Sequence, residues 1–148
     1  MMTELTPEVI DYIKDHKLDL LLNSDVTPVK KSIYESVNPK VVAPKSPEWD
    51  DLVRLHKLVR SRKVTTVLEF GCGYSTVIFA DAIEKNRQEF GDFVASNLRR
   101  SNQFEVHSVD DMPKYIKIAK SRLPKNLKSF VKFTRSEVLM TTFAGRIC

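Results

Sequence analysis

The chain has 148 residues, of which 42% are hydrophobic and 29% are charged, and its formal net charge is +5. This length fits one domain over residues 1–148, and this composition predicts a buried core, which excludes a disordered chain. The apolar runs are far shorter than the roughly 20 residues of a membrane span, and the N-terminus lacks the pattern of a secretory signal. The two cysteines, Cys72 and Cys148, exclude a disulfide framework, and no Cys/His spacing suggests a metal site. We therefore expect a soluble, cytoplasmic protein with no membrane partner.

Residues 1–63 are expected to form an N-terminal extension of helices and irregular segments. Thr6, Pro7 and Glu8 are typical of a helix start, because they supply a hydroxyl cap, a first-turn proline and an acid near the positive end of the helix dipole. Four prolines between residues 23 and 47 favour irregular or extended chain there. The next helix should bury one face with a spacing of three and four residues. This face comprises Trp49, Leu52, Val53, His56 and Val59.

From residue 64 onward, the pattern alternates between strands and helices. Residues 64–70, 104–109 and 130–134 are predicted to be strands, and the first has the β-branched, apolar composition of a strand covered on both faces. One helix is predicted after the first strand, capped by Ser75 or Thr76, and another from Pro113 to Leu123. The extra residues 86–102 predict an added helix. The right-handed crossover rule folds a β-α-β-α-β order into a parallel sheet with strand order 3-2-1, so the fold class is α/β.

The positive charge is concentrated in residues 112–135, which contain eight lysine or arginine residues and no acid. The rest of the chain then has 16 basic and 19 acidic residues, a balance of −3. Lys114, Lys117 and Lys120 recur at helical spacing, so one interpretation is a solvated helix face. The other is a patch that attracts an anionic partner such as a nucleic acid, although aromatic residues for base stacking are sparse there.

A glycine-containing loop follows the first predicted strand, in the stretch Glu69-Phe70-Gly71-Cys72-Gly73-Tyr74-Ser75-Thr76. Glycines at this place let a ligand approach the main chain, and the start of the next helix offers unpaired amide donors. The second strand ends at Asp110 and Asp111, where a carboxylate can bind both hydroxyls of a ribose. Thr76 stands where a dinucleotide fingerprint requires its third glycine, and Glu69 would repel a diphosphate, so NAD fits poorly. A ligand that carries a ribose and a positive charge fits better.

In these residues, the chain resembles the class I S-adenosylmethionine-dependent methyltransferases. Their first motif, an acid and then G-x-G after strand one, is matched by Glu69-Phe70-Gly71-Cys72-Gly73, and their second, an acid that ends strand two, by Val106-His107-Ser108-Val109-Asp110. A looser third match after strand three is Ser136-Glu137-Val138. The resemblance covers residues 64–138. It implies a Rossmann-like three-layer sandwich and S-adenosyl-L-methionine as the cofactor.

The resemblance also implies roles for the residues of the glycine loop. The backbone of Gly71, Cys72 and Gly73 would line the methionine part of the cofactor. Glu69 would orient this loop and reach the ammonium group through water. The residues that could close over the ligand are Tyr74, Ser75 and Thr76.

Further roles fall on residues after the second and third strands. Asp110 would hold the ribose hydroxyls, with Asp111 as the second candidate. Met112 would pack on the adenine face, and Glu137 or a nearby backbone amide would meet the polar edge of the adenine. The resemblance assigns no catalytic residue and no metal ligand in this chain.

The sequence departs from the family pattern in two respects. Asp110 follows Glu69 by 41 residues, about twice the usual spacing of such pairs. The family sheet has seven strands, whereas this chain ends 14 residues after its third predicted strand, so it looks like the cofactor-binding half without the catalytic half. The open edge of strand 64–70 then predicts a homodimer or coverage by residues 30–45. The alternative function is a non-catalytic S-adenosylmethionine- or nucleotide-binding module that acts through self-association.

Overall fold

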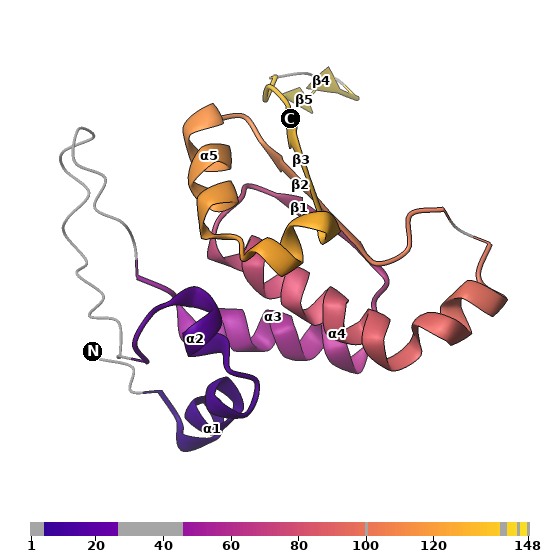
Figure 1. Cartoon of the computed structure of the whole chain (residues 1–148). Helices are drawn as coiled ribbons and strands as arrows, with labels where there is room; N and C mark the ends of the chain where they lie inside the picture. Colours follow the sequence, from indigo (N-terminus) through magenta and orange to yellow (C-terminus); the bar gives the residue numbers. More distant parts are fainter. Residues whose placement is uncertain (1–4, 27–45, 100, 140–141, 145, 148) are drawn as a thin grey trace.

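Three parallel strands form one sheet, which lies on one side of the described helices (Figure 1). The computed structural model describes residues 5–26, 46–99, 101–139, 142–144 and 146–147. Strands β1 (Thr66–Phe70), β2 (Glu105–Asp110) and β3 (Val131–Arg135) pair in parallel in the order β1-β2-β3. The predicted α/β class and the strand order 3-2-1 are therefore confirmed.

Helix α4 connects the first two strands, and α5 and η1 connect the second and third. α4 spans Tyr74–Asn97 and consists of two helical segments joined at a kink, and the second segment corresponds to the added helix that the sequence predicted. α4 bends at Phe90, whose φ of −139° is not helical, directly before Gly91, a residue type that weakens a helix. α5 spans Pro113–Arg122, and the 3-10 helix η1, which the sequence analysis missed, spans Lys125–Phe130.

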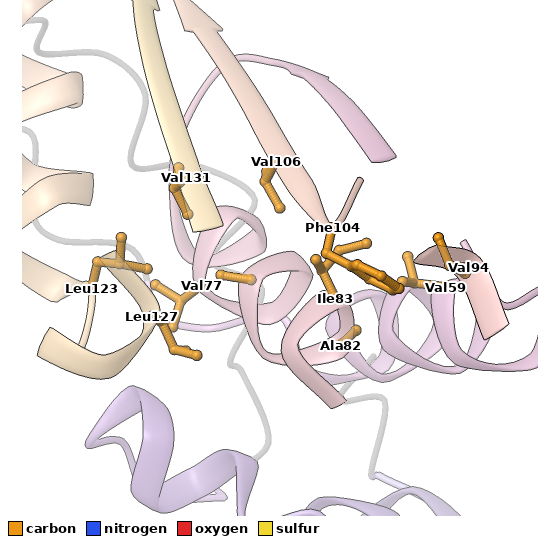
Figure 2. Close-up of a cluster of buried hydrophobic side chains, with 11 residues drawn as sticks. Val59, Val77, Ala82, Ile83, Val94, Phe104, Val106, Leu123, Leu127 and Val131 are labelled. Carbon is orange, nitrogen blue, oxygen red and sulfur yellow. The ribbon is translucent and has the colours of Figure 1, made fainter. Parts of the chain in front are cut away.

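The main hydrophobic core lies between the sheet and these helices (Figure 2). Val106 of β2 and Val131 of β3 pack with Val77 and Ile83 of α4, and with Leu127 of η1. Val67 of β1 packs against the same cluster. Since all three strands contribute to one core, α4, α5 and η1 cover the same face of the sheet.

The opposite face of β1 is exposed. Leu68 is 61% exposed and Phe70 is 80% exposed, whereas Glu69 between them is buried. The prediction that strand 64–70 is covered on both faces is therefore wrong, because within the described residues the helices pack on the face of Val67 and Glu69. The second helical layer of the predicted three-layer sandwich is not found in this part of the chain. Residues 30–45, expected as a cover for the strand edge, lie outside the described residues.

The N-terminal extension packs against α4. It contains α1 (Pro7–Asp15), α2 (Leu18–Leu22) and α3 (Trp49–Ser61), and its buried side chains form a second cluster with Ile78 of α4. All five predicted core positions of α3 are buried. At the start of α1, the Thr6 carbonyl, not the predicted hydroxyl cap, accepts the N–H group of Val9 at 3.0 Å.

Two further features complete the described fold. Near the C-terminal end, β4 (Thr142–Phe143) and β5 (Arg146–Ile147) form a small antiparallel pair. None of the helices in the described ranges combines the length and the apolar character that crossing a membrane requires.

A buried polar network joins α1, α3 and α4. His56 is fully buried, and its Nε2–H donates to Asp81 Oδ2 at 2.9 Å, because a carboxylate can only accept. His56 Nδ1 then accepts from the Tyr12 hydroxyl at 2.8 Å. Lys85 donates to the same Asp81 oxygen at 2.6 Å. His56 is thus a structural residue, as the sequence analysis expected.

Mild acid is expected to destabilise this network. Burial lowers the pKa of His56 below its ordinary 6.5, against the opposing effect of Asp81. Burial and the neighbouring His56, Lys85 and Arg60 also lower the pKa of His16, whose ring centroid lies 5.1 Å from that of His56. Because unfolding then takes up protons below about pH 6.5, the thermal midpoint should be flat above about pH 7 and should fall from about pH 6.5 to pH 5.

Differential scanning fluorimetry measures this midpoint. The His16→Gln variant should lose part of the slope, and a midpoint that rises on acidification contradicts the prediction.

Candidate functional site

The candidate site lies where β1 and β2 end and α4 begins. The loop of residues 71–73 connects β1 to α4, and the Gly71 N–H donates to the Val109 carbonyl at 2.7 Å. Gly71 has a φ of +84°, which L side chains rarely adopt, so glycine is favoured there by conformation. A Cβ atom added at Gly71 or Gly73 would meet nothing within 4 Å. The main chain of the loop is therefore open to a ligand, at the carboxyl edge of the sheet where α/β folds bind ligands.

Glu69 is the buried centre of a hydroxyl cluster. Its Oε2 atom accepts from Thr76 Oγ1 at 2.7 Å and from Ser108 Oγ at 2.6 Å, and its Oε1 atom accepts from the Ser75 hydroxyl. Thr76 also accepts the Gly73 N–H at 3.1 Å, which caps the start of α4. Glu69 thereby ties the end of β1 to β2 and to the first turn of α4. This arrangement fits the role of orienting the loop.

Asp110 holds the other side of the loop. Its Oδ2 atom accepts from the Cys72 N–H at 2.9 Å and from the Cys72 thiol at 3.3 Å, and its Oδ1 atom accepts from the Met112 N–H at 2.8 Å. Burial would raise the pKa of Asp110, but the hydrogen bonds from Cys72 and Met112 outweigh it and lower that pKa below its ordinary value. Asp110 is therefore a carboxylate at neutral pH, aimed at the glycine loop.

Asp110 retains the capacity to accept a diol. A carboxylate has about four acceptor positions, and the three hydrogen bonds from Cys72 and Met112 use one on Oδ1 and two on Oδ2. One ligand hydroxyl can therefore bind Oδ1 directly. The second can displace the Cys72 thiol, which is a weak donor.

Cys72 is held as an unreactive thiol. Burial, the hydrogen bond to Asp110 and the charges of Asp110 and Glu69 raise the pKa of Cys72 to about 12. The thiolate is the nucleophilic form of cysteine, so its population at neutral pH is negligible. Cys72 contributes backbone and packing to the loop, not nucleophilic chemistry.

The structure brings together Glu69, Gly71, Cys72, Gly73, Ser75 and Asp110 of the predicted site residues. Tyr74 lies elsewhere: its ring packs against the N-terminal core cluster, with the Arg122 guanidinium 4.0 Å from the ring centroid. It does not lie over the loop, where the sequence suggested that it could close on a ligand. Asp111, Met112 and Glu137 are exposed around the edge of the site.

Ser108 is a residue of the candidate site that the sequence analysis did not single out. It is fully buried, and it stands opposite Glu69 in the parallel register of β1 and β2. The alternation of β2 already indicated it, because Val106, Ser108 and Asp110 share one face of a strand. A serine on the same face of the strand as Asp110, which was predicted to bind the ligand, was the signal that could have pointed to it.

The described residues hold no group of three or more His, Cys, Asp or Glu side chains that is arranged to bind a metal ion. The chemistry of the site is that of two carboxylates beside an open loop, whose N–H groups at residues 71–73 already donate to Val109, Asp110 and Thr76. Comparison with known proteins finds neither a matching family model nor a matching curated protein.

Proposed function

We propose that this chain binds S-adenosylmethionine at the carboxyl ends of β1 and β2, as the cofactor-binding part of a Rossmann-like methyltransferase. The observation that supports this most strongly is the pair of buried carboxylates, Glu69 and Asp110, on either side of the glycine loop. When bound, the cofactor supplies an activated methyl group for transfer to an acceptor.

The donors and acceptors present suit each part of such a ligand. Asp110 is an ionised acceptor for the ribose hydroxyls, and the open main chain at Gly71 and Gly73 can lie against the methionine part. Glu69 is buried and accepts from three hydroxyl groups, so it acts on a cationic ligand mainly through its charge and through the loop it positions. The exposed Met112 lies beside Asp110, where it can pack on a base.

The same two carboxylates disfavour a dinucleotide. A diphosphate in the loop would lie next to the charges of Glu69 and Asp110, and Thr76 replaces the third glycine of the dinucleotide fingerprint. A ligand with a sulfonium and an ammonium group gains from the same charges. The electrostatics of the site therefore favour S-adenosylmethionine over NAD.

Isothermal titration calorimetry of the whole chain tests the proposal. S-adenosylmethionine and its demethylated product should each bind at one site and raise the thermal midpoint, and NAD should do neither. Folded protein that gives no heat with either compound, or that binds NAD more tightly, overturns the proposal.

A second candidate is a non-catalytic module that acts through self-association, and the exposed Leu68 and Phe70 on edge strand β1 favour it. An edge strand with apolar side chains is a template for pairing with a second copy. Light scattering coupled to size-exclusion chromatography should then show a dimer that Phe70→Asp converts to a monomer. A monomeric wild-type chain rejects this candidate.

A further inference from the structure

One surface of the molecule carries concentrated positive charge. It is formed by α5, by η1 and by the end of β3, which lie next to one another at the edge of the sheet away from β1 (Figure 1). Six exposed cations make up this basic surface: Lys114, Lys117, Lys120, Lys125, Lys128 and Arg135. Residues 113–135 contain no acidic residue that could neutralise them.

The basic surface differs from the N-terminal helices and α4 in how its charges are compensated. Cations of the N-terminal helices and α4 lie in ion pairs, as in Lys14–Asp19, Arg60–Glu89 and Lys85–Asp81. Among the described residues, none of the six cations of the basic surface lies in an ion pair. Lys132, the one neighbouring cation on the opposite face of β3, is paired with Glu105. Among the described residues, unpaired cations therefore gather on these adjoining elements, whereas Lys17, Arg62, Lys63 and Arg99 are exposed at separate places elsewhere.

The elements that carry these cations pack on one common core. Leu123 after α5, Leu127 of η1 and Val131 of β3 belong to the same buried cluster. Lys120 lies 5.4 Å from the centroid of the Phe133 ring, which joins α5 to β3 at the surface. Tyr115 and Met112 are exposed at the start of α5 and offer flat or apolar contacts beside the charges.

We propose that the basic surface binds the phosphate backbone of a single-stranded nucleic acid. Exposed cations on adjoining elements, without acidic partners among the described residues, match a chain of phosphates. The exposed Tyr115 provides a face on which a base can stack, which an acidic peptide would not need. The inference does not depend on cofactor binding, because none of the six cations belongs to the loop site.

Binding should depend steeply on salt. Four to six phosphate contacts on a single strand predict that affinity falls about 50- to 300-fold between about 50 and 200 mM salt. The probe is a fluorescein-labelled oligouridine of about 20 nucleotides, longer than typical single-strand sites, measured by fluorescence anisotropy. Wild-type protein that does not bind it at about 50 mM salt overturns the proposal.

A matched pair of variants tests whether binding depends on this surface or only on the net charge of the protein. The variant K114Q/K117Q/K125Q/K128Q removes four charges from the basic surface. The control variant K17Q/R62Q/K63Q/R99Q removes four exposed charges elsewhere, so both have the same net charge. The first should weaken binding at least about 10-fold and flatten the salt dependence, and the control should stay within about 3-fold of the wild type. Equal weakening by both overturns the proposal.

Competition identifies the class of partner. Unlabelled oligouridine should displace the probe, and polyglutamate of equal charge should displace it far less well. Polyglutamate that competes equally overturns the assignment to nucleic acid in favour of an acidic protein partner. Thermal midpoints of both variants within a few degrees of the wild type ensure that lost binding reports lost contacts, because all eight substituted side chains are exposed.

Discussion

Asp110→Ala should reduce the affinity for S-adenosylmethionine by about 100-fold or more. The substitution removes the ionised acceptor for two ribose hydroxyls, and hydrogen bonds to a charged group contribute about 1.5–3 kcal/mol each. It also frees the N–H groups of Cys72 and Met112, which now anchor the loop to β2. Calorimetry on the purified variant measures the loss, and circular dichroism verifies that the fold is retained.

Two further variants sharpen this test. Asp110→Asn keeps the size of the side chain and one acceptor oxygen, so it should retain the loop but still bind the ligand weakly. Asp111→Ala removes the adjacent exposed carboxylate and should leave affinity unchanged. Equal losses in the Asp110 and Asp111 variants would mean that the ribose is held by neither carboxylate specifically. Undiminished binding by Asp110→Ala would exclude Asp110 from the site.

Glu69→Ala is expected to lower the free energy of unfolding by about 2–5 kcal/mol, because it leaves buried hydroxyls without their acceptor. Two of the three hydroxyl groups that donate to Glu69, those of Thr76 and Ser108, are fully buried. The junction of β1, β2 and α4 would therefore lose its polar centre. Urea denaturation followed by circular dichroism measures the change.

Two further substitutions serve as controls for the effect of Glu69→Ala on stability. Glu69→Gln keeps an acceptor oxygen, and the hydroxyls can reorient toward it, so it should cost less than Glu69→Ala. Glu137→Ala changes an exposed acid near the end of β3 and should leave stability within about 0.5 kcal/mol of the wild type. A Glu69→Ala variant as stable as Glu137→Ala would show that the hydroxyl cluster contributes no net stability.

The two carboxylates of the site illustrate what could be predicted from the pattern of residues. Glu69 and Asp110 each stand at the end of a predicted strand, and parallel strands end at the same edge of a sheet, so their proximity to one loop followed from the alternation of strands and helices. The hydrogen-bond partners of these two carboxylates could not be predicted in the same way. Ser108 reaches Glu69 only through the register of β1 with β2, and the Cys72 thiol reaches Asp110 only through the path of the loop. Register and loop path depend on contacts across the fold, which short-range spacing does not encode.

Tyr74 and Phe70 illustrate the same limit for apolar residues. Its position in the sequence suggested that Tyr74 could close over a ligand. In the structure its ring packs against the N-terminal cluster and Arg122, which lies 48 residues later in the chain. The composition of strand 64–70 favoured burial on both faces, but the helices of the described residues cover only one. Apolar side chains are buried only where another element packs, and composition does not say which face that is.

The sequence by itself determined the alternation of strands and helices, the order of the three strands, the buried face of α3 and the glycine loop between two acids. These follow from short-range periodicity and from the handedness of the chain, which act within about one helix or one crossover. The tertiary structure alone decided that a kink at Phe90 joins the added helix to α4, that a buried serine completes the Glu69 cluster and that, among the described residues, no acid from elsewhere pairs with the six cations of the basic surface. Each of these depends on which distant residues meet when the core closes, because burial and charge pairing are properties of contacts and not of positions in the chain.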